Sequence, residues 1–116
     1  MACQKGRSIV VTSNSLARTV LAAGPIRFFM LYMVIERFRN PDLKAVGVRF
    51  TTQGRMLPPG VNYITSWMEC TGERCFQIME SPTREALNLW IKRWDDLVDF
   101  EVMPIQTSQE FWAARG

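Results

Sequence analysis

The chain has no histidine and only three cysteines among its 116 residues. A single chain without histidine cannot form a Ser-His-Asp or Cys-His site, a histidine metal site, or a histidine acid or base. Four residues separate Cys70 from Cys75, and no histidine exists to complete a metal site with them. We therefore predict no metal and no cofactor, and we interpret the cysteines as reduced thiols of a cytoplasmic protein.

The chain also lacks an apolar run of about 20 residues, internal repeats and low-complexity tracts. Its net charge of +3 comes from the first 29 residues, which carry four basic side chains and no acidic one. The remainder has ten basic and eleven acidic side chains. Because the remainder is not basic, we predict that neither nucleic acid nor a membrane is a partner.

Residues 1–29 contain short apolar runs that follow neither a helical nor a strand period. They fit a disordered tail, an acid-poor transit peptide, or an extension created by a misassigned start. We favour a misassigned start, because the patterned sequence begins abruptly at Met30. The domain is then expected over 30–108, with a tail or short helix over 109–116.

Hydrophobic periodicity and turn residues predict a definite order of elements beyond residue 29. The prediction is a strand over 29–37, a helix over 41–53 capped by Asn40, a loop over 55–60, a hairpin over 61–80, a helix that begins at Ser81-Pro82 and ends near Asp96, and a strand over 99–106. Pro104 has no backbone N–H to donate to a neighbouring strand. It therefore confines the last strand to an edge, or to a position where no such hydrogen bond is needed. Thr107 to Glu110 can cap a short terminal helix.

The hairpin is the clearest of these elements, because two runs rich in β-branched and aromatic residues flank Thr71-Gly72-Glu73-Arg74. If Cys70 lies opposite Cys75, Met68 pairs with Gln77 and Ser66 with Met79. Both faces of the hairpin are then largely apolar. In a sheet with one face toward solvent, apolar and polar residues should instead alternate along each strand. We infer that both faces are covered.

Strand, helix, strand, strand, helix, strand is the order of the ferredoxin-like α+β fold. Right-handed crossovers place both helices on one face of its four-stranded antiparallel sheet. One chain leaves the other face uncovered. Since the first strand and the hairpin are apolar on both faces, we expect a second copy to cover that open face in a homodimer.

Four segments in order, MLYMVIERFRN, GRMLPPG, SWMECTGERCFQIME and IKRWDDLVDFEVMPIQTS, resemble a family of short bacterial proteins known only as a domain of unknown function. The resemblance covers about 30–108. It implies a dimeric α/β-barrel and no particular activity. Residues 1–29 fall outside it, which agrees with a misassigned start.

Uniformly apolar positions are expected to face the helices, because a buried polar group without a partner is costly. This criterion selects Leu31, Met33, Ile35, Val61, Tyr63, Trp67, Phe76, Ile78, Phe100 and Val102. The opposite, open face would then carry Tyr32, Val34, Glu36, Ile64, Ser66, Met68, Cys70, Cys75, Gln77, Met79, Glu101 and Met103. Methionines with a few convergent polar groups suit a small-molecule pocket at a dimer interface.

The candidate ligand-binding residues on this face are Tyr32, Glu36, Ser66, Gln77, Met79 and Glu101. With the last strand antiparallel to the first, Glu36 and Glu101 are expected to lie close enough to couple, at about 4–6 Å, and to move protons or bind a cation. The alternative is two strand-end glutamates that face water or pair with nearby arginines.

Three functions remain open on the sequence. The first is a ligand-binding or sensing protein that holds a small hydrophobic molecule on the open sheet face. The second is a cofactor-free isomerase, monooxygenase or lyase, in which Glu36, Glu101, Gln77 and Tyr32 orient the substrate or move protons. The third is a purely structural module whose open face serves only oligomerisation.

Overall fold

The computed structural model describes residues 29–116, so the interpretations of residues 1–28 lie outside it. Its elements are, in order, β1 (Met30–Phe38), α2 (Lys44–Gln53), β2 (Asn62–Met68), β3 (Arg74–Ser81), α3 (Arg84–Lys92), β4 (Val98–Ile105) and α4 (Ser108–Ala114). No helix among the described residues is long and apolar enough to cross a membrane.

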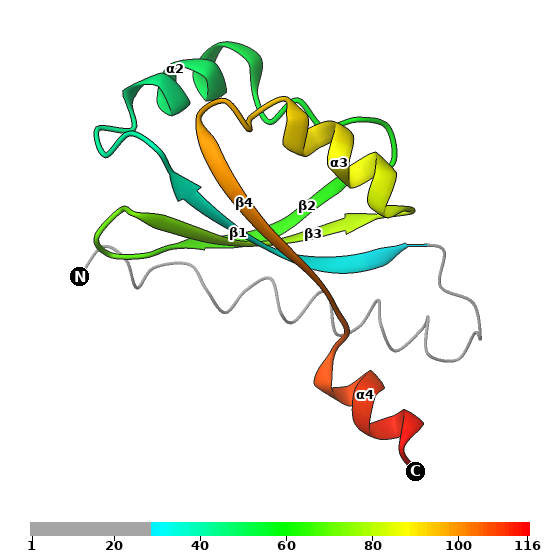
Figure 1. Ribbon diagram of the computed structural model, residues 1–116. Helices are drawn as coiled ribbons and strands as arrows, with labels where there is room; N and C mark the ends of the chain where they lie inside the picture. The colour runs from blue at the N-terminus through cyan, green and yellow to red at the C-terminus, as the bar shows by residue number, and fades with distance from the viewer. Residues whose placement is uncertain (1–28) are drawn as a thin grey trace.

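The four strands form one antiparallel sheet in the order β2-β3-β1-β4. Helices α2 and α3 lie on one face of this sheet, and α4 projects from the end of β4 (Figure 1). The predicted ferredoxin-like α+β fold is therefore confirmed. β4 is an edge strand, which accommodates Pro104 as predicted.

The start of α2 differs from the prediction. The Asn40 side chain accepts a hydrogen bond from the Asp42 backbone N–H at 3.2 Å, and the Asp42 carboxylate accepts one from the Lys44 N–H at 2.9 Å. These local bonds form turns in place of the predicted first helical turn. The helix begins at Lys44 and ends before Gly54, whose φ of 68° suits glycine.

Helix α3 begins after Thr83, not at Pro82. The Thr83 hydroxyl accepts a hydrogen bond from the Ala86 N–H at 3.0 Å, while the Ser81 hydroxyl donates to the Thr83 carbonyl at 2.7 Å. Thr83 is thus the N-cap, and Ser81 orients the residue that caps. The predicted cap of α4 is confirmed, because Thr107 and Glu110 form a reciprocal capping box.

The core forms between α3 and the sheet. The helix side consists of the predicted apolar stripe with Leu87, Trp90 and Trp94, and the sheet side consists of Tyr32, Val34, Val61 and Met79. Trp90 and Trp94 are 2% and 6% exposed, in agreement with their interpretation as core residues. Stability therefore depends mainly on the packing of α3 against the sheet, because α2 has no buried residue.

The predicted faces of β1 and β3 are wrong. Tyr32, Val34 and Met79 pack beneath the helices, so alternation turns Met33, Ile35 and Ile78 to the opposite face. The prediction failed because it treated polar Glu36 and Gln77 as too costly to lie beneath helices, whereas a cavity there receives both. Phe100 and Val102 of β4 do pack on the helix side, as predicted.

The predicted hairpin register is also wrong, by two residues. Met68, not Cys70, lies opposite Cys75, and Ser66 lies opposite Gln77. The pair of Glu69 and Arg74 closes the loop through a backbone hydrogen bond of 2.8 Å and a side-chain ion pair of 2.8 Å. The Cys75 thiol is free, so the two cysteines of the hairpin are not joined to each other.

A β-bulge in β2 breaks the alternation on which the face prediction relied. The register shifts between Tyr63 and Thr65, so Ile64 is an extra residue relative to β3. As a result Tyr63 and Ser66 lie on the same face, with their hydroxyl oxygens 2.6 Å apart. Tyr63 therefore keeps its predicted helix-side position, while Ser66 and Met68 join it there.

Candidate functional site

A cavity of about 200 Å³ lies between the sheet and the helices. We call it the central cavity. Its sheet side carries Glu36, Ser66, Met68, Cys75 and Gln77, and its other walls include Phe38, Val46, Phe50, Arg55, Trp90, Trp94 and Val98. Apolar walls with a few convergent polar groups are typical of a ligand pocket.

The strand register explains why the polar groups converge. Cys75 of β3 lies opposite Glu36 of β1 on one side and opposite Met68 of β2 on the other. Two residues further along β3, Gln77 lies opposite Ser66. Since residues two apart share a face, the same period that builds the core also brings Glu36, Ser66 and Gln77 together.

Glu36 is the carboxyl group of the central cavity. Burial beneath the helices raises the pKa of Glu36 from 4.5 to about 7, although a hydrogen bond with the Cys75 thiol and the positive charge of Arg55 both lower it. At neutral pH the carboxyl group therefore exists in both protonation states. A group of this kind can donate or accept a proton near physiological pH.

The Cys75 thiol is a poor nucleophile in this setting. Burial, followed by the nearby charge of Glu36, raises the pKa of Cys75 from 9.0 to about 12. The thiol is therefore protonated at neutral pH, and the thiolate is the reactive form. Cys75 serves as a neighbour that hydrogen-bonds Glu36, not as a reactive cysteine.

Gln77 carries the most informative polar atom of the site. The residue is only 5% exposed, and its side-chain Nε2 has no hydrogen-bond partner among residues 29–116. A buried donor without a partner costs about 1–3 kcal/mol. No other buried side-chain nitrogen or oxygen in this part of the chain lacks a partner.

The loop between α2 and β2 places Arg55 at the cavity. The Arg55 carbonyl accepts hydrogen bonds from both indole N–H groups, at 3.1 Å from Trp90 and 3.0 Å from Trp94. Its guanidinium lies 3.6 Å from the centroid of the Tyr63 ring. The next residue, Met56, has a left-handed φ of 59°, which is unusual for a residue other than glycine.

Sequence reasoning missed Arg55 as a site residue and treated the two tryptophans as core residues only. The available signal was the segment GRMLPPG, which follows α2 directly and carries a cation next to a turn glycine. Nothing in the sequence showed that one carbonyl would accept from two indoles that lie 35 and 39 residues away. That arrangement depends on the packing of α3.

The structure brings together three of the six predicted ligand-binding residues. Glu36, Ser66 and Gln77 line the central cavity, although beneath the helices and not on the open sheet face. Tyr32 and Met79 are fully buried in the core on the same side of the sheet and do not line the cavity.

The predicted pair of Glu36 and Glu101 is wrong. Glu36 lies opposite Phe100, and Glu101 lies opposite Ile35. Because successive residues of a strand point to opposite faces, Glu36 points toward the helices and Glu101 points to the other face, where it is exposed. The two carboxylates cannot act together.

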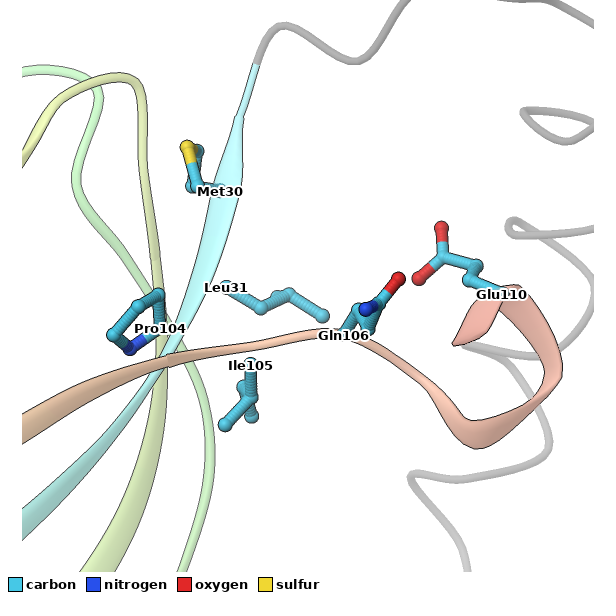
Figure 2. A pocket seen from close by; sticks show the side chains of 6 residues that line it. All are labelled: Met30, Leu31, Pro104, Ile105, Gln106 and Glu110. Carbon is cyan, nitrogen blue, oxygen red and sulfur yellow. The ribbon is translucent and has the colours of Figure 1, made fainter. Parts of the chain in front are cut away.

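Two other cavities lie at the edges of the domain. One of about 400 Å³ lies where β1 begins and β4 ends, and Figure 2 shows its lining residues, Met30, Leu31, Pro104, Ile105, Gln106 and Glu110. Its carboxylate, Glu110, already accepts hydrogen bonds from Thr107 in the capping box. The other, of about 260 Å³, adjoins Asp96, which is paired with Arg49 at 2.7 Å.

No group of three or more Cys, Asp or Glu side chains in residues 29–116 is arranged to hold a metal ion. Three acidic side chains of this region, Asp99, Asp96 and Glu69, form separate pairs with Arg39, Arg49 and Arg74. Glu36 is thus the single acid of the central cavity.

Comparison with known proteins agrees with the resemblance seen in the sequence. Residues 30–115 match the model of a family described as a domain of unknown function, DUF3303, and the chain belongs to that family. None of the curated proteins is significantly similar to the chain, and neither is any solved structure.

Proposed function

We propose that this member of the DUF3303 family binds a small molecule in the central cavity. The single observation that carries the proposal is Gln77, whose side chain lines the cavity and whose Nε2 is a buried donor without a partner in the described chain. A ligand that offers an acceptor would complete its hydrogen bonding.

The composition of the walls supports the same function. Phe50, Trp90 and Trp94 provide apolar surface, and the indole N–H groups of both tryptophans are already satisfied by the Arg55 carbonyl. The Tyr63 and Ser66 hydroxyls are likewise bonded to each other. The polar groups left to recognise a ligand are therefore Glu36, Gln77 and the Arg55 guanidinium.

Native mass spectrometry of the protein purified from its own host tests this proposal. We expect the wild-type protein to retain a small molecule that is displaced on denaturation. Gln77→Met, which keeps the side-chain volume and removes the amide, should retain at least tenfold less of it. Gln53→Met, at the exposed end of α2, is the matched control and should retain as much as the wild type.

A second candidate function, a cofactor-free isomerase, monooxygenase or lyase, is favoured by one observation. The pKa of Glu36 is about 7, which suits a group that takes and returns a proton at neutral pH. Once a ligand is identified, Glu36→Gln separates the two functions. A binding protein would change only in affinity, whereas an enzyme would lose turnover by a factor of at least 10².

A further inference from the structure

We infer that the ligand is a neutral single-ring compound with a weakly acidic hydroxyl group on an sp² carbon, as in a phenol or a cyclic enol. Its oxygen would accept a hydrogen bond from Gln77 Nε2 and share its proton with the Glu36 carboxylate. This inference rests on the proposed function, because it assumes that the central cavity binds a ligand.

The size of the cavity suits a ligand with one ring. A closed apolar cavity of about 150 Å³ accommodates benzene, and the central cavity measures about 200 Å³. One ring with one or two small substituents fits this volume. The aromatic walls formed by Phe50, Trp90 and Trp94 suit a flat ring.

The charges of the cavity walls indicate a neutral ligand. Among the lining residues Glu36 is the only acid and Arg55 the only base, so their formal charges cancel when Glu36 is ionised. Arg55 belongs to none of the ion pairs formed within residues 29–116, which leaves its positive charge to balance Glu36. A ligand with a permanent charge would leave one charge unbalanced beneath the helices, which is costly.

A weakly acidic hydroxyl group satisfies all three recognition groups at once. Its proton can move to a carboxylate oxygen of Glu36 when the O–H bond breaks, and the electron pair of that bond stays on the ligand oxygen. The Gln77 N–H and the Arg55 guanidinium then stabilise the negative oxygen. The total charge of the site is unchanged, because the proton only changes its position.

The other polar groups of the cavity argue against a covalent ligand. Ser66 and Tyr63 are bonded to each other at 2.6 Å, and Cys75 is held as a thiol. No histidine exists in the chain to activate any of these hydroxyl or thiol groups. The ligand is therefore held by hydrogen bonds and packing alone.

Binding of 4-nitrophenol and 4-nitroanisole to the full chain tests the ligand class. The two compounds share one ring and one nitro group, but only the phenol carries an acidic hydroxyl group. We expect the wild type to bind the phenol at least tenfold more tightly than the anisole by calorimetry.

Two variants separate recognition from general packing. In Glu36→Gln the preference for the phenol should fall to about one, because the carboxylate that accepts the proton is lost. Glu101→Gln, on the opposite face of the same sheet, should keep the wild-type preference. Circular dichroism of each variant establishes that it is folded before binding is compared.

Equal affinity for the two compounds, or a preference that survives Glu36→Gln, would overturn the ligand class. If neither compound binds but the purified protein retains another molecule that Gln77→Met loses, the ligand class is wrong and the proposed function stands. If neither compound binds and nothing is retained, both proposals fail.

Discussion

At the scale of single residues, the site depends on two buried polar side chains. Apolar side chains at the same positions would make the fold more stable. Gln77 leaves an N–H unpaired, and Glu36 is buried enough to raise its pKa to about 7. Each residue weakens the empty fold, so each offers a stability measurement that is independent of any ligand.

The first prediction concerns Gln77. Gln77→Met should raise the free energy of unfolding of the empty protein by about 1–2 kcal/mol, because it removes a buried donor that has no partner and keeps the volume. Urea denaturation measures this change, with Gln53→Met as the control. A destabilised Gln77→Met would show that the amide already has a partner, such as an ordered water, and that it stabilises the empty fold.

The second prediction concerns the pH dependence of stability. Folded Glu36 holds its proton up to about pH 7, whereas the unfolded chain releases it near pH 4.5. The folded state therefore binds more protons between these values, and stability should fall as the pH rises from 4.5 to 7. Since a tenfold change in proton affinity corresponds to about 1.4 kcal/mol, the contribution of Glu36 to this loss is roughly 2–3 kcal/mol.

Urea denaturation at several pH values isolates the contribution of Glu36. Glu36→Gln cannot ionise, so it should lose this decline and become more stable than the wild type above pH 7. Glu101→Gln, exposed on the opposite face, should keep the decline. If stability declines by the same amount in Glu36→Gln, other titrating groups cause the decline.

At the scale of elements, the helices differ in what they contribute. α3 supplies Leu87 and Trp90 to the core, whereas α4 has no buried residue and its Trp112 is 67% exposed. Both begin with a threonine cap. The same substitution at the two caps can therefore compare a core helix with a peripheral one.

The third prediction uses this comparison. Thr83→Ala should lower the global free energy of unfolding by about 1 kcal/mol, because α3 forms together with the core. Thr107→Ala should leave the global value unchanged and increase hydrogen exchange only in α4, since this helix can open locally. Equal losses in the two variants would show that α4 unfolds together with the core.

The order of the elements could be predicted from sequence because periodicity and caps act locally. The proline-containing edge strand, the glycine after α2 and the capping box of α4 all follow from neighbours along the chain. The bulge at Ile64 and the hairpin register depend on contacts between strands. One extra residue reverses the faces of everything beyond it, which sequence alternation cannot reveal.

The site was partly predictable for a related reason. Glu36, Ser66 and Gln77 were correctly grouped, because positions on paired strands share a face whichever face that is. The choice of face was wrong because both faces are apolar. The role of Arg55 depends on a left-handed Met56 and on two distant indoles, neither of which has a local signal.

At the scale of the whole molecule, the corrected faces change which residues a partner would contact. The face that carries neither α2 nor α3 presents large apolar side chains, among them Met33, Ile35, Phe76, Ile78 and Trp67, which is 37% exposed. This is the open face on which the homodimer is predicted to form. The ligand cavity lies on the other side of the sheet, so dimerisation and ligand binding would use separate surfaces.

The fourth prediction tests this dimer. Size-exclusion chromatography with light scattering should give the mass of two chains, and Ile78→Glu should give a single chain, because it places a charge in an apolar interface. Val48→Glu changes an exposed apolar residue of α2 and should remain dimeric. A wild-type protein of single-chain mass would contradict the prediction.

The most direct test of the central claim is a crystal structure of the protein purified from its own host. We predict density for a bound molecule in the central cavity, with an acceptor atom within about 3.2 Å of Gln77 Nε2. A central cavity that holds only water, or a retained molecule bound elsewhere on the sheet, would contradict the claim.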